Sequence, residues 1–264
     1  MTPSRTEWLK ELWHYRELLY FLAWRDVTIR YKQAALGAAW AILQPVMGMI
    51  IFTLFFGRLA GMQSGDIPYP IFVYAGLAPW TYFATVLNTA GNSLIGNSNL
   101  VTKVYFPRVL LPGASAAAGL LDLAISSSVL LLLMLYYRIA PGWTLLWLPV
   151  LIVGLVLVSV GVSMLFAALN VRYRDIKHAM PFLIQMWLFC TPIVYPTSLV
   201  PERFRPLLSL NPCWGIIDGI RSALLGSSTF DTPAVLTSLA SASVIFVVGL
   251  LYFRSAERSF ADVI

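Results

Sequence analysis

Charged residues are scarce in this sequence. Only 11% of its 264 residues are Asp, Glu, Lys or Arg, whereas a soluble domain carries roughly 25%. Hydrophobic residues make up 59%, so the composition predicts an integral membrane protein. The net charge of +6 comes from residues at the edges of apolar runs rather than from one basic face. We therefore expect the positive charges to orient the chain in the membrane, and we expect no nucleic-acid partner.

Sequence patterns of catalysis and metal binding are missing as well. The two cysteines, Cys190 and Cys213, fit neither a disulfide framework nor a metal site, and we expect both to be packing residues. No glycine is followed by lysine, which excludes the common phosphate-binding loop. His14 and His178 lie far apart in the sequence and outside any carboxylate-rich cluster. We expect no catalytic residue, no metal and no cofactor bound by this chain itself.

Long apolar runs predict membrane-spanning helices, because a helix needs about 20 apolar residues to cross a ~30 Å hydrocarbon core. We expect an all-α integral membrane protein with six transmembrane helices in a single transmembrane domain. The fifth is the weakest, because Pro181, Pro192 and Pro196 leave it a short helical core. The six predicted spans are residues 38–59, 69–91, 109–137, 143–170, 179–195 and 232–253.

The 18 Lys and Arg residues are unequally divided between the two sides that six spans define. Most precede the first span or lie in the second loop, the fourth loop and the tail, residues 254–264. Because cytoplasmic loops carry an excess of Lys and Arg, we expect both termini and these loops in the cytoplasm.

Residues 4–32 predict an amphipathic helix before the first span. Ser4 and Glu7 form a capping-box pattern, and apolar residues then recur at spacings of four and three. We expect this interface helix to lie along the inner membrane surface, the alternative being a soluble helix packed on another element. Its predicted apolar stripe is Trp8, Leu12, Tyr15, Leu19 and Leu22.

Residues 200–226 predict short helices on the outer side. Asn211 is an expected N-cap, Pro212 occupies the first helical position, and Gly226 follows the last. The helix between them would be ~21 Å long, too short to cross a bilayer but too apolar for water. We expect a re-entrant helical hairpin between spans five and six, shielded by protein. An amphipathic hairpin outside the membrane is the alternative.

Polar and aromatic residues inside the spans are candidates for a substrate path. Asp122 interrupts the third span and is either a polar point on a hydrated path or a carboxylate capped by neighbouring groups. The stretch "YAGLAPWTYF" places several aromatic rings beside Pro79, where they either stack on the C–H faces of sugars or pack in the core. The predicted path residues are Trp40, Tyr74, Trp80, Tyr82, Phe83 and Asp122.

The loop after the second span, "LVTKVYFPRVLLP", is apolar and basic. "GNSN" before it supplies turn and N-cap residues, and Pro107 ends the following helix. A contiguous apolar patch facing the cytosol is rarely tolerated, so we expect residues 97–108 to form a coupling helix that docks on a cytoplasmic partner. The alternative is a loop buried against the chain's own N-terminal helix. The predicted contact residues are Leu100, Val101, Lys103, Val104, Tyr105, Phe106 and Arg108.

The chain resembles the permease subunits of ABC transporters that export bacterial polysaccharides such as O-antigen, capsule and teichoic acid. The resemblance extends in the family's order over nearly the whole chain. The matching stretches are "IRYKQAALGAAWAILQP" at 29–45, "GLAPWTYF" at 76–83, "LVTKVYFPRVLLP" at 100–112, "LNVRYRDI" at 169–176, "TPIVYP" at 191–196 and "LNPCWGIIDGIR" at 210–221.

The resemblance implies a homodimer in the bacterial cytoplasmic (inner) membrane, joined to two copies of a separate cytoplasmic ATP-binding subunit that binds ATP and Mg. It implies that the interface helix and residues 100–108 contact that subunit, and that a lipid-linked polysaccharide enters near the inner surface. The re-entrant outer helices would close the exit. The predicted outer-gate residues are Tyr195, Phe204, Trp214 and Arg221.

We therefore expect a transport subunit without enzymatic activity, moved by ATP binding in its partner. Two alternatives stay open. An ABC permease of the same architecture would export a drug or small lipid. An ion-driven carrier or flippase would work without an ATPase and would depend on Asp122, but the poor supply of buried ionisable groups argues against it.

Overall fold

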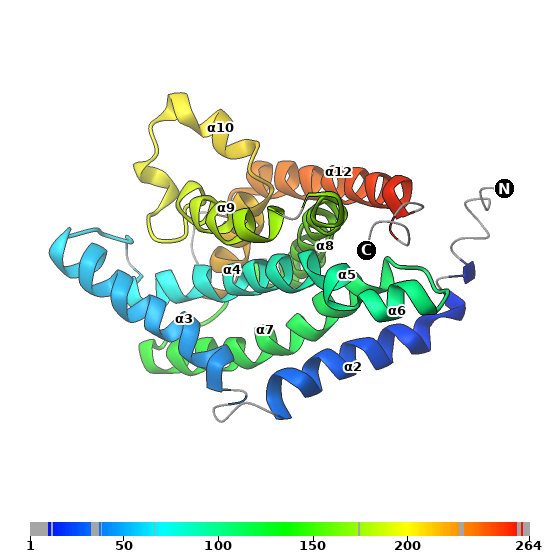
Figure 1. The fold of residues 1–264 in the computed structure, drawn as a ribbon. Coiled ribbons are helices and arrows are strands. Elements are labelled where there is room, and N and C mark those ends of the chain that lie inside the picture. Colours follow the sequence, from blue (N-terminus) through cyan, green and yellow to red (C-terminus); the bar gives the residue numbers. More distant parts are fainter. Residues whose placement is uncertain are drawn as a thin grey trace.

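The structure, a computed structural model, describes residues 10–11, 13–32, 37, 39–65, 67–173, 175–226, 230–257 and 260. The chain folds into helices and connecting loops, and no strand occurs in this part of it (Figure 1). The all-α prediction is confirmed.

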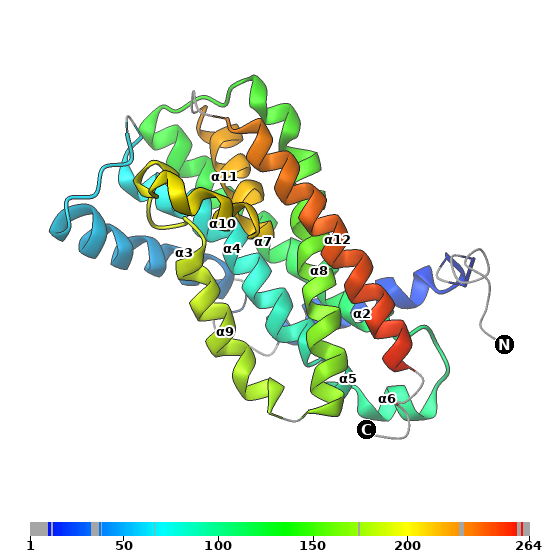
Figure 2. The same ribbon diagram turned by 90° about the horizontal axis from the view of Figure 1, so that it is seen from above.

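Four long helices form the centre of the molecule and run side by side (Figure 2). They are α4 Tyr69–Gly91, α7 Leu110–Tyr137, α8 Leu148–Arg172 and α12 Thr232–Ala256. The helix α4 is the most buried of the four, because α7, α8 and the shorter α11, Pro212–Leu225, pack around it. The helix α12 packs along α8.

Five helical segments of the described residues are long and apolar enough to cross a membrane. They match the first four and the last predicted spans to within three residues at each end. The first combines α3, Ala39–Phe52, with the π-helical turn η1, Thr53–Leu59, and the fourth begins with the 3-10 turn η2, Trp143–Trp147. The five segments are Ala39–Leu59, Tyr69–Gly91, Leu110–Tyr137, Trp143–Arg172 and Thr232–Ala256.

The helix α9, Ile176–Cys190, takes the place of the fifth predicted span. Its 15 residues rise ~22 Å, less than the ~30 Å core. It starts three residues before the predicted bound and ends five before it, because the chain turns at residues 191–195. A sixth crossing therefore stays a prediction.

The predicted helix between Asn211 and Gly226 is confirmed as α11. The Asn211 carboxamide oxygen accepts a hydrogen bond from the Cys213 N–H at 3.1 Å, and Gly226 ends the helix at a φ of 63°. Nearly all of α11 is buried, and a Cβ on Gly215 would lie 2.1 Å from the carbonyl oxygen of Ala234 in α12. Shorter pieces precede it: η3 Thr197–Leu199, η4 Glu202–Phe204 and α10 Arg205–Ser209.

The N-terminal helix α2, Arg16–Lys32, packs along α7. Leu22 is buried in the core and Leu19 reaches Gly113 of α7, so these residues of the predicted apolar stripe pack against the protein. The position of the helix along the membrane surface stays a prediction. The exposed face of the N-terminal region is itself aromatic, a feature that the sequence pattern did not reveal. Trp8, Leu12 and the capping pattern of Ser4 and Glu7 lie outside the described residues. The exposed aromatic residues are Trp13, Tyr20, Phe21 and Trp24.

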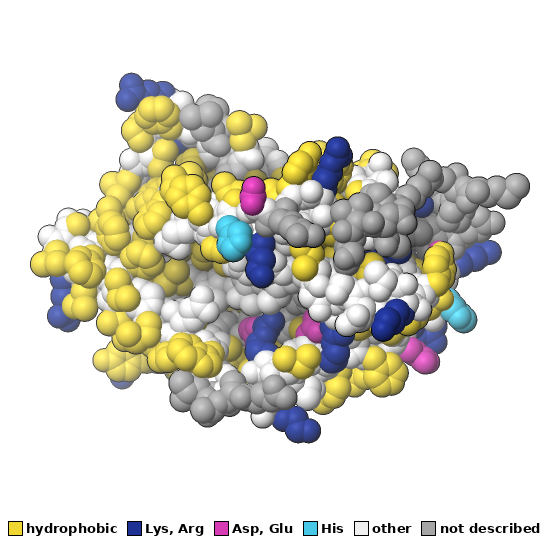
Figure 3. Space-filling model, viewed as in Figure 1, with side chains coloured by type: hydrophobic (Ala, Val, Ile, Leu, Met, Phe, Trp, Pro, Cys, Tyr) yellow, Lys and Arg dark blue, Asp and Glu magenta, His cyan; other side chains and the backbone are white. Residues whose placement is uncertain are grey.

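The two ends of the bundle differ. The short helices α5, Ser93–Gly96, and α6, Ser98–Lys103, lie at the end where α2 begins and α12 finishes, whereas α10 and α11 lie toward the other end (Figure 2). Hydrophobic side chains cover the surface over α3 and η1, and Lys and Arg are more frequent toward the end with α5 and α6 (Figure 3). The molecule thus has an apolar side and one basic end.

Candidate functional site

The predicted coupling helix is shorter in the structure than in the sequence prediction. The helix α6 ends at Lys103, and residues 104–108 continue without regular structure. Val104 already has an extended conformation. Because Pro107 disfavours helical geometry in the residue before it, the helix stops ahead of the proline rather than at residue 108.

Burial divides the segment into two groups of residues. Val101 and Phe106 are 2% and 3% exposed and belong to the main hydrophobic core. Val104 and Tyr105 are 52% and 80% exposed. Of the other predicted contact residues, Lys103 is exposed, and Leu100 and Arg108 are half-buried. Val101 and Phe106 therefore anchor the segment in its own chain, whereas Val104 and Tyr105 lie at the surface, and the docking role stays a prediction.

Two contacts tie residues 105–108 to the ends of the chain. The Tyr105 hydroxyl donates a hydrogen bond to the Glu11 carboxylate at 3.2 Å, and that carboxylate raises the pKa of the tyrosine. The Arg108 backbone N–H donates to the Glu257 carboxylate at 3.0 Å, and its guanidinium donates to the Glu257 carbonyl oxygen. Burial raises the pKa of the Glu257 carboxyl, and Arg108 partly opposes the shift. Sequence reasoning missed both carboxylates, since they are 94 and 149 residues away from their partners.

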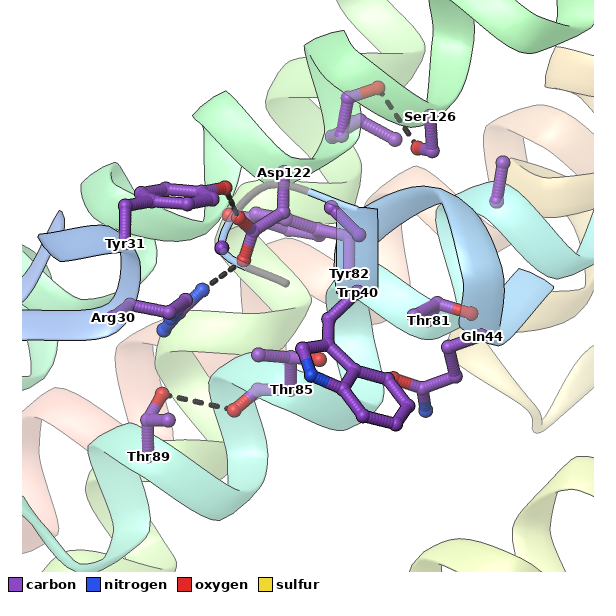
Figure 4. A pocket seen from close by; sticks show the side chains of 14 residues that line it. Arg30, Tyr31, Trp40, Gln44, Thr81, Tyr82, Thr85, Thr89, Asp122 and Ser126 are labelled. Atoms are coloured by element: carbon purple, nitrogen blue, oxygen red, sulfur yellow. Dashed lines mark hydrogen bonds and ion pairs between the residues drawn. The ribbon is translucent and has the colours of Figure 1, made fainter. Parts of the chain in front are cut away.

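A cavity of about 170 Å³ lies between α2, α3, α4 and α7 (Figure 4). At its wall Asp122 forms an ion pair with Arg30 and accepts a hydrogen bond from the Tyr31 hydroxyl. Asp122 is thus a carboxylate with bonded partners, but these come from another helix rather than from its neighbours in the sequence. The partners were missed because they stand at the end of the preceding interface helix, 92 and 91 residues before Asp122.

Three of the six predicted path residues, Trp40, Tyr82 and Asp122, line this cavity. The other polar lining comes mainly from α4, where Thr81, Thr85 and Thr89 recur every four residues and so occupy one helix face. That spacing was visible in the sequence and is the signal that could have located the cavity. Gln44 of α3, Ser126 of α7 and the ion pair described above complete its polar groups.

The other three predicted path residues lie inside the bundle. Trp80 and Phe83 contact each other with ring centres 5.2 Å apart, and Phe83 meets Trp187 of α9 edge to face at 5.1 Å. The Tyr74 hydroxyl donates to the Ser126 carbonyl oxygen at 2.9 Å. At 0–5% exposure these side chains do not reach a path on the surface of the chain, so for them the packing alternative holds.

The predicted outer-gate residues also separate into two groups. Tyr195 and Phe204 line a cavity of about 520 Å³ together with Trp187 and Asn211. Trp214 is buried in α11, with its indole N–H 3.4 Å from the Thr197 hydroxyl. The first two are therefore placed at an accessible hollow, whereas Trp214 holds α11 against the segment before it.

Arg221 is largely buried and connects several elements of the outer end, although it also lines a cavity of about 690 Å³ together with Thr197 and Asp218. Its side chain is 4% exposed, and one nitrogen donates to the carbonyl oxygens of Pro192 and Ile193 at 3.0 and 3.1 Å. Another nitrogen lies 3.3 Å from the Asp218 carboxylate, and the guanidinium stacks 4.0 Å from the Phe72 ring centre. The guanidinium thus joins α11, α4 and the turn after α9. Gly76 of α4 leaves room for it, since a Cβ there would lie 2.6 Å from the guanidinium.

Residues with catalytic or metal-binding side chains do not gather in the described part of the chain. No group of three or more His, Cys, Asp and Glu residues occurs there. Both cysteines are free thiols: Cys213 is buried as expected, whereas Cys190 is exposed, so its predicted packing role is wrong.

Known proteins of two kinds are similar to this chain from end to end. An O-antigen export system permease protein, RfbA, from Myxococcus xanthus is 29% identical over 96% of this chain and 98% of its own length. A Klebsiella pneumoniae RfbA is 28% identical over 94% and 95%. The polysialic acid transport protein KpsM from Escherichia coli is 24% identical over 89% and 92%.

A family model described as the ABC-2 type transporter matches residues 17–225. The match includes the Arg30–Asp122 cavity, the segment after α6 and all of α11. The chain is therefore a member of the membrane-protein family of ABC-2 type transporters.

Proposed function

We propose that this chain is the permease subunit of an ABC transporter that exports a lipid-linked polysaccharide across the bacterial cytoplasmic membrane. The observation that carries the proposal is the end-to-end similarity to two kinds of protein, one named an O-antigen export system permease and one a polysialic acid transport protein. Both names refer to carbohydrate polymers. The resemblance of the motifs supports the same conclusion.

The exposed part of the coupling segment is the proposed docking surface for a separate cytoplasmic ATP-binding subunit, which binds ATP and Mg. Lys103, Val104 and Tyr105 are exposed there, on a segment that Val101 and Phe106 anchor in the core. A force applied to this surface is therefore transmitted to the helix bundle. The partner drives transport only if it holds the segment differently with and without ATP.

The chain works as a homodimer with six crossings in each copy, both termini in the cytoplasm and two ATP-binding subunits. The first span supports this assembly, because only 6% of its apolar window is buried within one chain. A second copy and membrane lipids supply its missing contacts. The polymer enters between the copies near the inner surface and leaves past the re-entrant segment formed by η3 to α11, where Tyr195 and Phe204 lie at an accessible hollow.

The ion pair in the cavity argues against an ion-driven carrier. Asp122 is held by the Arg30 guanidinium and the Tyr31 hydroxyl, so its carboxylate is not free to bind a transported cation. Export of a drug or small lipid by the same architecture would leave the surface polysaccharide unchanged when the chain is removed.

The test is a deletion of the gene in its own bacterium, followed by measurement of cell-surface polysaccharide. We expect the polymer to disappear from the surface and accumulate inside the cell, and expression of the intact chain to restore export. The same phenotype is expected when the ATP-binding partner carries an inactivated phosphate-binding loop. Unchanged surface polymer in the deletion strain, or increased drug sensitivity alone, would overturn the proposal.

A further inference from the structure

The cavity between α2, α3, α4 and α7 contains hydrogen-bonding groups that the fold leaves unused. Gln44, Thr81 and Trp40 line it, and their side chains form no hydrogen bond with another residue of the cavity wall (Figure 4). Gln44 and Trp40 are exposed and Thr81 is half-buried, so a ligand in the hollow can reach them. Polar side chains that converge on a hollow without a partner in its wall are the groups that orient a polar ligand.

The charges of the cavity cancel. The Arg30 guanidinium is the cation at its wall, and the Asp122 carboxylate is paired with it. The Tyr31 hydroxyl also donates a hydrogen bond to that carboxylate. A site with no surplus positive charge does not favour a phosphate over water, so an uncharged ligand rich in hydroxyl groups fits better than an anion.

The aromatic ring of Trp40 lies beside these polar groups. The Trp40 indole, 56% exposed, lies next to Gln44 and Thr85 in the close view of the cavity (Figure 4). Its face is therefore available to the C–H face of a sugar ring. The Gln44 amide has a donor and an acceptor atom that can bond at once to two neighbouring hydroxyl groups of a sugar.

The size of the cavity limits the ligand. At ~30 Å³ per water molecule, about 170 Å³ corresponds to roughly six waters. That space admits a single sugar ring and excludes a folded stretch of polymer. A polysaccharide would therefore meet this site one residue at a time.

We propose that this cavity binds one uncharged sugar residue of the transported polysaccharide, stacked on Trp40 and hydrogen-bonded by Gln44 and Thr81. The inference rests on the proposed function and adds to it a defined subsite. Because Arg30 and Asp122 join the end of α2 to α7, the occupied site also lies at the junction between the N-terminal helix and the bundle.

The test compares variants of the complex with its ATP-binding partner in lipid nanodiscs. Gln44→Leu and Thr81→Val remove groups that make no hydrogen bond within the cavity wall, so the fold should tolerate both. Thr237→Val in α12 is the matched control, an exposed threonine remote from the cavity. The probes are the methyl glycosides of glucose, galactose and mannose, with inorganic pyrophosphate as the anionic probe, and binding is followed by saturation-transfer NMR.

We expect at least one glycoside to bind the wild-type complex, with a signal that falls at least fivefold in the double variant Gln44→Leu/Thr81→Val and in Trp40→Ala. The signal should stay at the wild-type value in Thr237→Val and largely return in Trp40→Phe. Equal glycoside signals in the double variant and the wild type, binding of none of the glycosides, or binding of pyrophosphate in their place, would overturn the inference.

Export in cells separates this inference from the proposed function. The double variant, produced in the deletion strain at wild-type amounts, should lower surface polysaccharide at least tenfold. If the deletion itself leaves the surface polymer intact, the proposed function fails. If the deletion abolishes the polymer and the double variant restores it fully, the transporter is confirmed and the sugar subsite is refuted.

Discussion

Replacing Arg221 by methionine should destabilise the whole bundle rather than alter a gate. The guanidinium satisfies two carbonyl oxygens in the turn after α9 and pairs with Asp218, and its side chain is 4% exposed. Methionine has a similar length but donates no hydrogen bond. The substitution therefore leaves two carbonyl groups and the Asp218 carboxylate, whose side chain is 23% exposed, without their partner.

The magnitude follows from that burial. Removing one partner of a buried ion pair costs about 3–5 kcal/mol, because the other charge stays behind uncompensated. At about 2–4 °C per kcal/mol for a chain of this size, Arg221→Met should lower Tm by roughly 6–20 °C. Adding Asp218→Asn removes the stranded charge, so the double variant should recover part of the loss.

The assay is thermal unfolding of the purified chain, followed by its loss from the main peak in size-exclusion chromatography. Arg205→Met in α10 is the control, because the Arg205–Glu202 pair is 3.8 Å apart with side chains 48% and 89% exposed, and such pairs contribute about 1 kcal/mol or less. A wild-type Tm for Arg221→Met combined with altered export would refute the structural role and restore the gate interpretation.

Three further changes test the coupling segment and the packing of the bundle. Tyr105→Asp should leave Tm unchanged and abolish export while the partner still hydrolyses ATP. Phe106→Asp should lower Tm, because that side chain is only 3% exposed. Export by the tyrosine variant at the wild-type rate would contradict the docking role. Gly249→Ala places a Cβ 2.3 Å from the Gly161 carbonyl oxygen and should cost about 1–3 kcal/mol, measured as a lower Tm than for Gly96→Ala, whose Cβ meets nothing within 4 Å. Because burial raises the pKa of Glu257 above its ordinary 4.5, the folded state binds its proton more tightly, and stability should fall as pH rises through the folded-state pKa; Glu257→Gln should remove that slope from a series of Tm measurements against pH.

The lengths of the apolar runs and the residues that cap or end helices were enough to predict most of the elements. The helix α11 begins and ends where Asn211, Pro212 and Gly226 predict, because capping and the left-handed C-terminal residue are local effects. Five helical segments match their predicted spans, because each span was predicted from the length and composition of one continuous apolar run. The predicted bounds of the fifth span were wrong, because the turn after Cys190 depends on contacts such as those of Arg221 with residues 192 and 193.

The faces of the helices were harder to predict than their ends. In a chain that is apolar on every side, lipid-facing and buried positions have the same composition, so Trp80 and Phe83 looked like candidates for a path although they pack in the core. The apolar stripe of α2 was predicted from its spacing, but its contact with α7 was not. The Arg30–Asp122 pair depends on tertiary packing, which residue spacing does not encode.

The most direct test of the account is reconstitution of this chain in sealed vesicles loaded with lipid-linked polysaccharide, with and without its ATP-binding partner. The account predicts that polymer crosses the membrane when both subunits and Mg-ATP are present. It also predicts that removing the partner or the nucleotide, or introducing Tyr105→Asp, stops the movement. Polymer export by this chain alone, driven by an ion gradient and without a nucleotide-hydrolysing subunit, would contradict it.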